Sequence, residues 1–266
     1  MREPMVLEDV QSEKDGRNIA LSKVGLKALK RPVILIDDGP KPQHTVALMN
    51  LYVDLPAHAK GTHMSRFIEV LEANVFPLSV HNIHTLVEKM IGRLGAKNGY
   101  IELKFTYFKM KKAPVSLAES LLDYEVELYA SIVNGQHKLQ VVVDVPMMSL
   151  CPCSKKISEF NAHNQRASVK LLVEATPVMS IDEIIAIAER GASSQLYSII
   201  KREDEKYITE YAYQHPKFVE DMARELAEQL VSYKNIRYYR VSCENFESIH
   251  NHSAYAEIEG GSHYKP

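Results

Sequence analysis

The stretch Ser149-Leu-Cys-Pro-Cys-Ser-Lys-Lys-Ile-Ser-Glu-Phe-Asn-Ala-His-Asn-Gln-Arg166 lies between two apolar runs with strand character, residues 139–145 and 167–173. It holds two of the three cysteines, one of the eleven histidines and several cationic and amide side chains. A polar connection between strands makes a poor core segment and a good site segment, because loops carried by rigid strands bring side chains to solvent. We therefore expect the functional site to form around this cysteine loop, residues 149–166.

Composition narrows the class of protein. The 266 residues suffice for one large domain or two ordinary ones, and 45% hydrophobic with 25% charged residues is typical of soluble globular proteins. A net charge of −2 does not favour nucleic-acid binding. No apolar run approaches the ~20 residues of a membrane span, and the N-terminus lacks a signal-peptide core. An odd count of three cysteines indicates a cytoplasmic protein with available thiolates.

Hydrophobic periodicity predicts the same order of elements in each half of the chain. In the second half we expect strands at 138–145 and 167–175, helices at 180–190 and 216–233, and strands at 236–243 and 254–258. In the first half we expect a strand at 45–55, helices at about 62–73 and 80–94, and strands at 100–111 and 122–133. Each half therefore contains two helices followed by two strands, with strand sequence before them.

This order predicts an α+β fold of two antiparallel sheets, each with a pair of helices on one face. We assign residues 1–40 to an N-terminal arm and lead-in, 41–135 to a first module, and 136–266 to a second module that carries most of the site. Open sheets leave edge strands that must be covered. Subunits joined side by side into a closed barrel would cover them, so we expect an oligomer.

The cysteine loop carries residues suited to metal binding. Cys151 and Cys153 are one residue apart, which is a tight spacing for one tetrahedral ion, so we expect only Cys151, beside the strand end, to bind directly. His163 follows in a polar neighbourhood. Thiolate, imidazole and carboxylate together suit Zn²⁺, and less selectively Mn²⁺ or Fe²⁺. The plain alternatives are a small buried thiol and a surface histidine.

Acidic candidates come from three distant segments. Glu205 lies in a run of charges, which is also typical of a solvated loop. Glu247 and His250 lie between the last two predicted strands, at what is otherwise a polar hairpin tip. Glu220 lies in the first turn of the last long helix, where the helix dipole favours acidic residues. Its functional interpretation is a carboxylate that accepts two hydrogen bonds from a guanine-like edge.

Four segments together resemble a known family: Ser149-Leu-Cys-Pro-Cys-Ser-Lys155, Gly61-Thr-His-Met-Ser-Arg-Phe67, Ala162-His-Asn-Gln-Arg166 and His215-Pro-Lys-Phe-Val-Glu-Asp221. The chain is similar to GTP cyclohydrolase IB, a bacterial metal-dependent family, from about residue 40 to 259. The resemblance implies the tunnelling fold, in which tandem antiparallel sheets with paired helices assemble as a homotetrameric barrel.

The resemblance also implies roles for the candidate residues. Cys151 would be the catalytic cysteine at the metal, and the ligands and acid–base groups would come from His163, Glu205, Glu247 and His250. Glu220 would anchor the purine. Candidates for the triphosphate, each also explained as solubilising charge, are Lys155, Lys156, Arg166 and Arg66.

The reaction implied is that of GTP cyclohydrolase I. GTP is hydrolysed at guanine C8 to 7,8-dihydroneopterin triphosphate and formate, a step that feeds folate or queuosine synthesis. The divalent ion would supply the activated water, and His163 or His250 would protonate the imidazole nitrogen.

Three alternatives stay open at this point. The first is a nitrile-reducing oxidoreductase of the same fold, with a cysteine nucleophile and a nicotinamide cofactor. The second is a metal-binding oligomer without turnover. The third is a structural oligomer whose Cys-x-Cys pair is redox-active.

Overall fold

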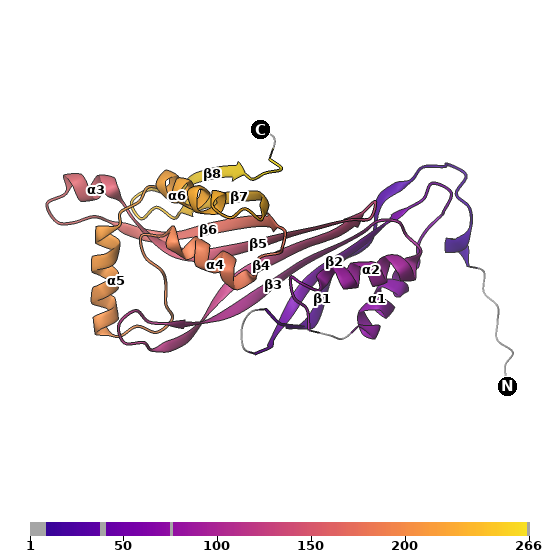
Figure 1. Cartoon of the computed structure of the whole chain (residues 1–266), viewed down its shortest axis with the longest axis horizontal. Coiled ribbons are helices and arrows are strands. Elements are labelled where there is room, and N and C mark those ends of the chain that lie inside the picture. The colour runs from indigo at the N-terminus through magenta and orange to yellow at the C-terminus, as the bar shows by residue number, and fades with distance from the viewer. Residues whose placement is uncertain (1–8, 38–40, 75–76, 265–266) are drawn as a thin grey trace.

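The computed structural model describes residues 9–37, 41–74 and 77–264. Eight strands form one antiparallel sheet in which every strand pairs with its neighbours in sequence (Figure 1). The first half contains η1 (Val10–Ser12), β1 (Leu21–Leu35), β2 (Gln43–Leu55), α1 (Met64–Ala73), α2 (Ile83–Leu94), β3 (Gly99–Lys112) and β4 (Glu119–Val133). The second half contains β5 (Gln136–Leu150), α3 (Pro152–Ile157), β6 (Asn164–Ala175), α4 (Ile181–Arg190), α5 (Arg202–Gln214), α6 (Val219–Val231), β7 (Ile236–Asn245) and β8 (Ala254–Gly260).

The two sheets expected from the sequence are joined into one. Between β4 and β5 the chain turns at Asn134 and Gly135, both with positive φ (50° and 75°), as a two-residue turn of this hairpin type requires. The strands then pair from Val133 opposite Gln136 to Glu125 opposite Asp144. This long ladder makes the two halves one continuous antiparallel sheet, and the α+β class is confirmed.

One hydrophobic core runs along one face of the sheet. Alternate residues of every central strand are buried, as in Val141, Val143 and Val145 of β5. They join the buried faces of α1, α2, α4 and α6 in a single cluster. None of the described helices covers the opposite sheet face, where charged side chains such as Glu127 and Lys170 lie among exposed apolar ones such as Phe108. Among the described residues, no helix is long and apolar enough to cross a bilayer.

Strand β1 lies within the range assigned to the lead-in. It pairs with β2 along most of its length, so the first group of four strands begins before residue 41. A Cβ at Gly25 would lie 1.9 Å from the Leu51 carbonyl oxygen, so this close approach of two strands requires glycine. A bulge follows, where Ala28 has positive φ and its N–H donates to Asn50 Oδ1 at 2.8 Å.

The described part of the predicted arm lies against the segment that precedes α1. The Asp15 N–H donates to the His58 carbonyl oxygen at 2.9 Å, and the Lys60 N–H donates to that of Glu13 at 3.1 Å. Gln11 Nε2 also donates to the Thr62 carbonyl oxygen at 3.2 Å. Residues 1–8 of the predicted arm lie outside the described residues.

The four helices with an apolar stripe were predicted, and two others were missed. α3 is a single short helix within the cysteine loop. α5 contains Glu205, whose run of charges is also typical of a solvated loop. This helix buries only Asp204 and Ala212, so it has no apolar periodicity from which to recognise it.

Candidate active site

The cysteine loop is closed by hydrogen bonds between its two ends. Cys151 follows β5 and caps α3, where its Sγ accepts a hydrogen bond from the Ser154 N–H at 3.5 Å. Pro152 takes the first helical position, which suits its fixed φ. The Cys151 N–H donates to the His163 carbonyl oxygen at 3.1 Å, and the His163 N–H donates to the Ser154 hydroxyl at 3.3 Å. The backbone thus holds Cys151 and His163 next to each other across the loop base.

The imidazole of His163 is oriented by its neighbours. Its Nδ1 lies 3.0 Å from Gln165 Oε1 and 3.0 Å from Ser248 Oγ. Gln165 donates in turn from Nε2 to Glu247 Oε1 at 3.3 Å. Because the Gln165 oxygen can only accept, Nδ1 carries the proton and Nε2 the lone pair. No described residue hydrogen-bonds Nε2, so this nitrogen is open to a ligand.

These two donors fit a divalent ion, although one chain does not assemble a complete ligand set. Histidines that bind metals typically donate their other ring N–H to an oxygen, as His163 does. The Cys151 thiol is unpaired and partly exposed. Among the described residues, no three His, Cys, Asp or Glu side chains are grouped to hold a metal ion.

Glu220 follows, by three residues, the point where the segment before α6 is fastened to the end of β5. The Lys217 N–H donates to the Leu150 carbonyl oxygen at 3.1 Å. The cap of α6 comes from Asp221, whose carboxylate accepts the Phe218 N–H at 3.0 Å. Glu220 is exposed in the first turn of α6, where the helix dipole favours a carboxylate, and it takes no part in this cap.

Glu205 lies at the start of α5, whereas Lys155 of α3 contacts the other end of that helix. Glu205 is exposed in the first turn, and Tyr213 follows about 12 Å along the axis at 1.5 Å per residue. Lys155 Nζ donates to the Tyr213 carbonyl oxygen at 2.5 Å and lies 4.2 Å from the centroid of its ring. Within one chain, Glu205 is therefore separated from the cysteine loop. The Lys155 ammonium is already engaged in holding the end of α5.

The loop between β7 and β8 supplies two residues, Glu247 and Ser248, to the cysteine loop. Glu247 reaches it through Gln165, as described above. His250 is exposed and stacks on His252 with ring centroids 5.1 Å apart. Arg166 accepts the Phe246 N–H on its carbonyl oxygen at 3.0 Å, and its side chain is exposed. Arg166 therefore ends the cysteine loop and His250 lies on the β7–β8 loop, both with exposed side chains.

Arg66 lies elsewhere in the chain. It belongs to α1, which is at the opposite end of the molecule from α3 (Figure 1). There it lines a separate cleft of about 380 Å³ together with His58 and His63. A single chain does not bring Arg66 to the cysteine loop.

Buried polar residues beneath the loop were not predicted from the sequence. Ser149, fully buried, donates from Oγ to the Lys217 carbonyl oxygen at 3.1 Å and accepts from Asn245 Nδ2 at 3.2 Å. Gln165 is also buried, and Ser248 lies on the β7–β8 loop. The one sequence signal for Gln165 is its polar side chain at an inward-facing position of β6.

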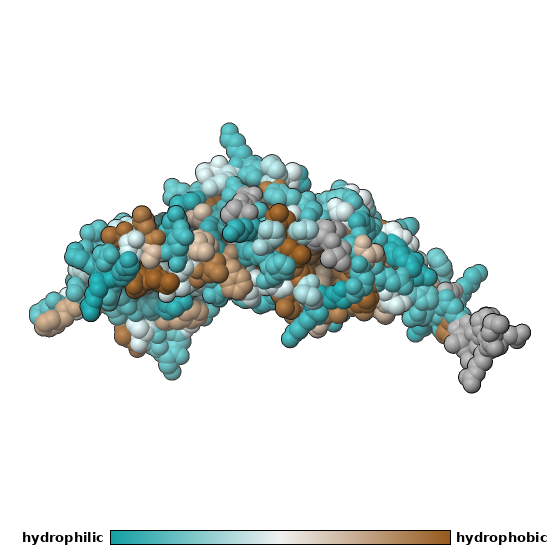
Figure 2. All heavy atoms as spheres, turned by 90° about the horizontal axis from the view of Figure 1, so that it is seen from below, coloured by the Kyte–Doolittle hydropathy of each residue, from teal (hydrophilic) through white to brown (hydrophobic). Residues whose placement is uncertain are grey.

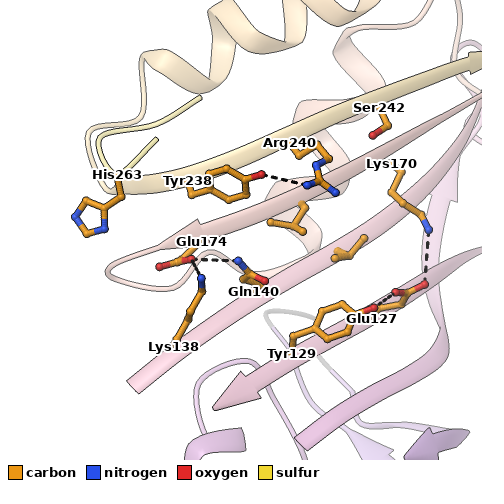
Figure 3. A pocket seen from close by; sticks show the side chains of 12 residues that line it. Glu127, Tyr129, Lys138, Gln140, Lys170, Glu174, Tyr238, Arg240, Ser242 and His263 are labelled. Atoms are coloured by element: carbon orange, nitrogen blue, oxygen red, sulfur yellow. Dashed lines mark hydrogen bonds and ion pairs between the residues drawn. The ribbon is translucent and has the colours of Figure 1, made fainter. Parts of the chain in front are cut away.

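A larger cleft lies on the helix-free face of the sheet and contains none of the predicted site residues (Figure 3). Its volume is about 650 Å³. The cations within it are paired: Lys138 with Glu174 at 3.1 Å and Lys170 with Glu127 at 3.6 Å. Arg240, also in this cleft, pairs with Glu259 at 2.6 Å. These internal ion pairs account for the charges without a ligand.

Two of the thiols, Cys153 and Cys243, are predicted to differ in reactivity. Cys153 is exposed, whereas Cys243 is fully buried in β7, and burial raises its pKa to about 12. At pH 8 only about 10⁻⁴ of Cys243 would be thiolate, the reactive form. In the native protein we expect iodoacetamide to modify Cys153 and to spare Cys243, as measured by peptide mass mapping. Equal modification of both without denaturant would contradict this assignment.

Comparison with known proteins points to one family. The family model described as Type I GTP cyclohydrolase folE2 matches residues 7–256. GTP cyclohydrolase FolE2 of Magnetococcus marinus is 49% identical over 255 residues, which is 96% of both chains. The protein of the same name from Thermosipho africanus is 48% identical over 250 residues, covering 94% of this chain and 96% of that protein.

Solved structures resemble the chain in fold alone. Uricase from Arthrobacter globiformis superposes with a TM-score of 0.51 at 7% identity, covering 90% of this chain and 92% of that one. A hyperthermostable mutant of Bacillus sp. TB-90 urate oxidase gives 0.51 at 8% identity, covering 92% and 100%. These enzymes have the tunnelling fold, which confirms the fold that the sequence resemblance implied.

Proposed function

This chain belongs to the type I GTP cyclohydrolase FolE2 family, and from that premise we propose how its own residues carry out the reaction. The activity is that of GTP cyclohydrolase I, which hydrolyses the guanine ring of GTP at C8, releases formate and forms 7,8-dihydroneopterin triphosphate. The observation that supports the placement of the site is the closed cysteine loop, where Cys151 and His163 meet with His163 Nε2 open.

We propose that Cys151 Sγ and His163 Nε2 hold the divalent ion. Further ligands would come from Glu247 and His250 and, because α5 separates Glu205 from the cysteine loop of its own chain, from Glu205 of a neighbouring copy. The mixture of sulfur, nitrogen and oxygen donors suits Zn²⁺, Mn²⁺ or Fe²⁺. When bound, the ion would act as a Lewis acid that lowers the pKa of water and so provides a nucleophile at neutral pH.

The hydrogen bonds of His163 assign different roles to the two candidate histidines, His163 and His250. Its Nδ1 proton is directed at Gln165, so Nε2 is its single nitrogen for a ligand and cannot also donate a proton. Protonation of the guanine imidazole nitrogen then falls to His250, which is exposed on the neighbouring loop. Proton donation at that nitrogen makes C8 more electrophilic.

Glu220 is proposed to orient the guanine. An ionised carboxylate accepts two hydrogen bonds, which matches the N1–H and exocyclic NH₂ of guanine. Because α6 is fastened to β5 through Lys217 and Leu150, the anchored ring would face the cysteine loop. Arg166, exposed beside the loop, is the first candidate for the triphosphate.

We propose that the working form is a homotetramer in the cytoplasm. β1 and β8 each pair on one side only within the described chain, and open edges favour closure by further copies. Apolar side chains are exposed in several patches on one face (Figure 2), and Phe160 of the cysteine loop is 91% exposed. A second copy would also bring an Arg66 to the site. Three unpaired cysteines suit a reducing compartment.

The proposal is tested by incubating chelator-treated protein with GTP, NADPH and one added metal at a time. We expect one formate and one fluorescent pterin per GTP after addition of Zn²⁺, Mn²⁺ or Fe²⁺, without consumption of NADPH. No turnover is expected before metal is added. Metal binding without formate release under any of the three ions would identify a non-catalytic metal-binding protein instead.

A further inference from the structure

Asp204 is a fully buried carboxylate with no role in the chemistry described above. Its Oδ1 accepts the N–H groups of Val115 at 2.9 Å and Ser116 at 2.8 Å. Its Oδ2 accepts the Ser116 hydroxyl at 2.5 Å and the Lys201 N–H at 2.8 Å. Four donors saturate the acceptor capacity of a carboxylate, so this group is built into the structure in its ionised form.

These bonds join two parts of the chain. Val115 and Ser116 belong to the turn between β3 and β4, whereas Lys201 precedes α5. Asp204 therefore caps α5 and attaches it to that turn. The rest of α5 has little packing of its own, since Ala212 is its one other buried residue. The position of the helix start depends mainly on this carboxylate.

The other end of α5 is attached to the cysteine loop. Lys155 of α3 donates to the Tyr213 carbonyl oxygen, and three residues after α5 the Lys217 N–H donates to Leu150. Figure 1 shows α5 standing across the end of the sheet, with α3 near one end of it. α5 thus connects the β3–β4 turn with the loop that holds Cys151, and it carries Glu205 directly after Asp204.

We propose that Asp204 is a positioning residue for the metal site: by fixing α5 to the β3–β4 turn, it steadies the cysteine loop of its own chain and sets the place of Glu205, which would reach the site of a neighbouring copy. The proposal rests on the proposed function, because it takes Glu205 and Cys151 as ligands. It adds a residue that touches neither metal nor substrate. Buried groups that orient ligands are typically worth about 10- to 100-fold in metal affinity.

The test uses the full-length protein with Asp204→Asn. The amide places an NH₂ group where the Ser116 hydroxyl and the Lys201 N–H now donate, so α5 loses part of its attachment. We expect Zn²⁺ and Mn²⁺ affinity to fall about 10- to 100-fold. We also expect kcat to fall while KM for GTP changes little, because Glu220 is attached independently through Lys217. All measurements are made well below the melting temperature of the variant.

Glu203→Gln is the matched control, because Glu203 is exposed in the same helical turn. It should keep wild-type metal affinity. Ser116→Ala deletes one of the four hydrogen bonds to Asp204 and should lower metal affinity by a smaller factor. If Asp204→Asn does not fold, the metal affinity of Ser116→Ala provides the test. A lower melting temperature with unchanged metal affinity and kcat in the folded variants would overturn the proposal. If Glu205→Gln weakens metal binding and Asp204→Asn does not, this inference fails while the proposed function stands.

Discussion

Replacing Cys151 with alanine is expected to lower kcat/KM for GTP by about 10³-fold or more and to reduce the bound metal. The thiolate is the sulfur ligand proposed at the site, and it sits at the loop base beside His163. A metal contributes several kcal/mol of transition-state stabilisation, and about 4 kcal/mol corresponds to about 10³-fold in rate. Steady-state kinetics and metal analysis of the purified variant measure both effects.

Two further variants separate the metal role from the structure of the loop. Cys151→Ser keeps a side-chain acceptor for the cap of α3 but offers a harder ligand, so its activity should also be low. Cys153→Ala removes the exposed thiol two residues on and should retain activity within a few-fold. If Cys153→Ala lost activity as completely as Cys151→Ala, a redox pair would explain the motif better than a metal ligand.

Replacing Glu220 with glutamine is expected to raise KM for GTP about 10- to 150-fold. Hydrogen bonds to a charged group contribute about 1.5–3 kcal/mol, which corresponds to this range. Glutamine offers one acceptor and directs its NH₂ towards the donor edge of guanine. The cap of α6 is supplied by Asp221 and is untouched, so the variant should fold normally.

The control for this variant is Glu228→Gln, an exposed glutamate further along the same helix. It should leave KM unchanged. KM for ITP, which lacks the exocyclic amino group, should already be high in the wild type and change little in Glu220→Gln. An unchanged KM for GTP in Glu220→Gln would remove this residue from the purine site.

The strongest sequence patterns predicted most of the fold. Helices with an apolar stripe, such as α2 and α6, and strands with buried alternation, such as β5 and β6, were recognisable because their packing repeats at the period of the element. α5 was missed because it is held by one buried carboxylate rather than by an apolar face. The pairing that joins the two halves is local, since β4 and β5 form a hairpin around Asn134-Gly135. The expectation of two separate sheets overlooked this turn signal.

The site was predictable where its residues are close in sequence. Cys151 and His163 are brought together by a local hairpin, so the loop itself indicated the pair. Of the residues that orient the imidazole, Gln165 was recognisable as an amide of the loop but not by this role, and Ser248 carries no signal as an isolated polar residue. Arg66 belongs to α1, at the opposite end of the molecule from the cysteine loop (Figure 1). Any contact between them depends on assembly of several copies, which no local sequence pattern indicates.

The most direct measurement is a crystal structure of the protein soaked with Mn²⁺ or Zn²⁺, with anomalous scattering recorded at the metal edge. We predict one peak per chain within bonding distance of Cys151 Sγ and His163 Nε2, with Nδ1 of that histidine still facing Gln165. A peak away from the cysteine loop, or none at saturating metal in an active preparation, would contradict the account.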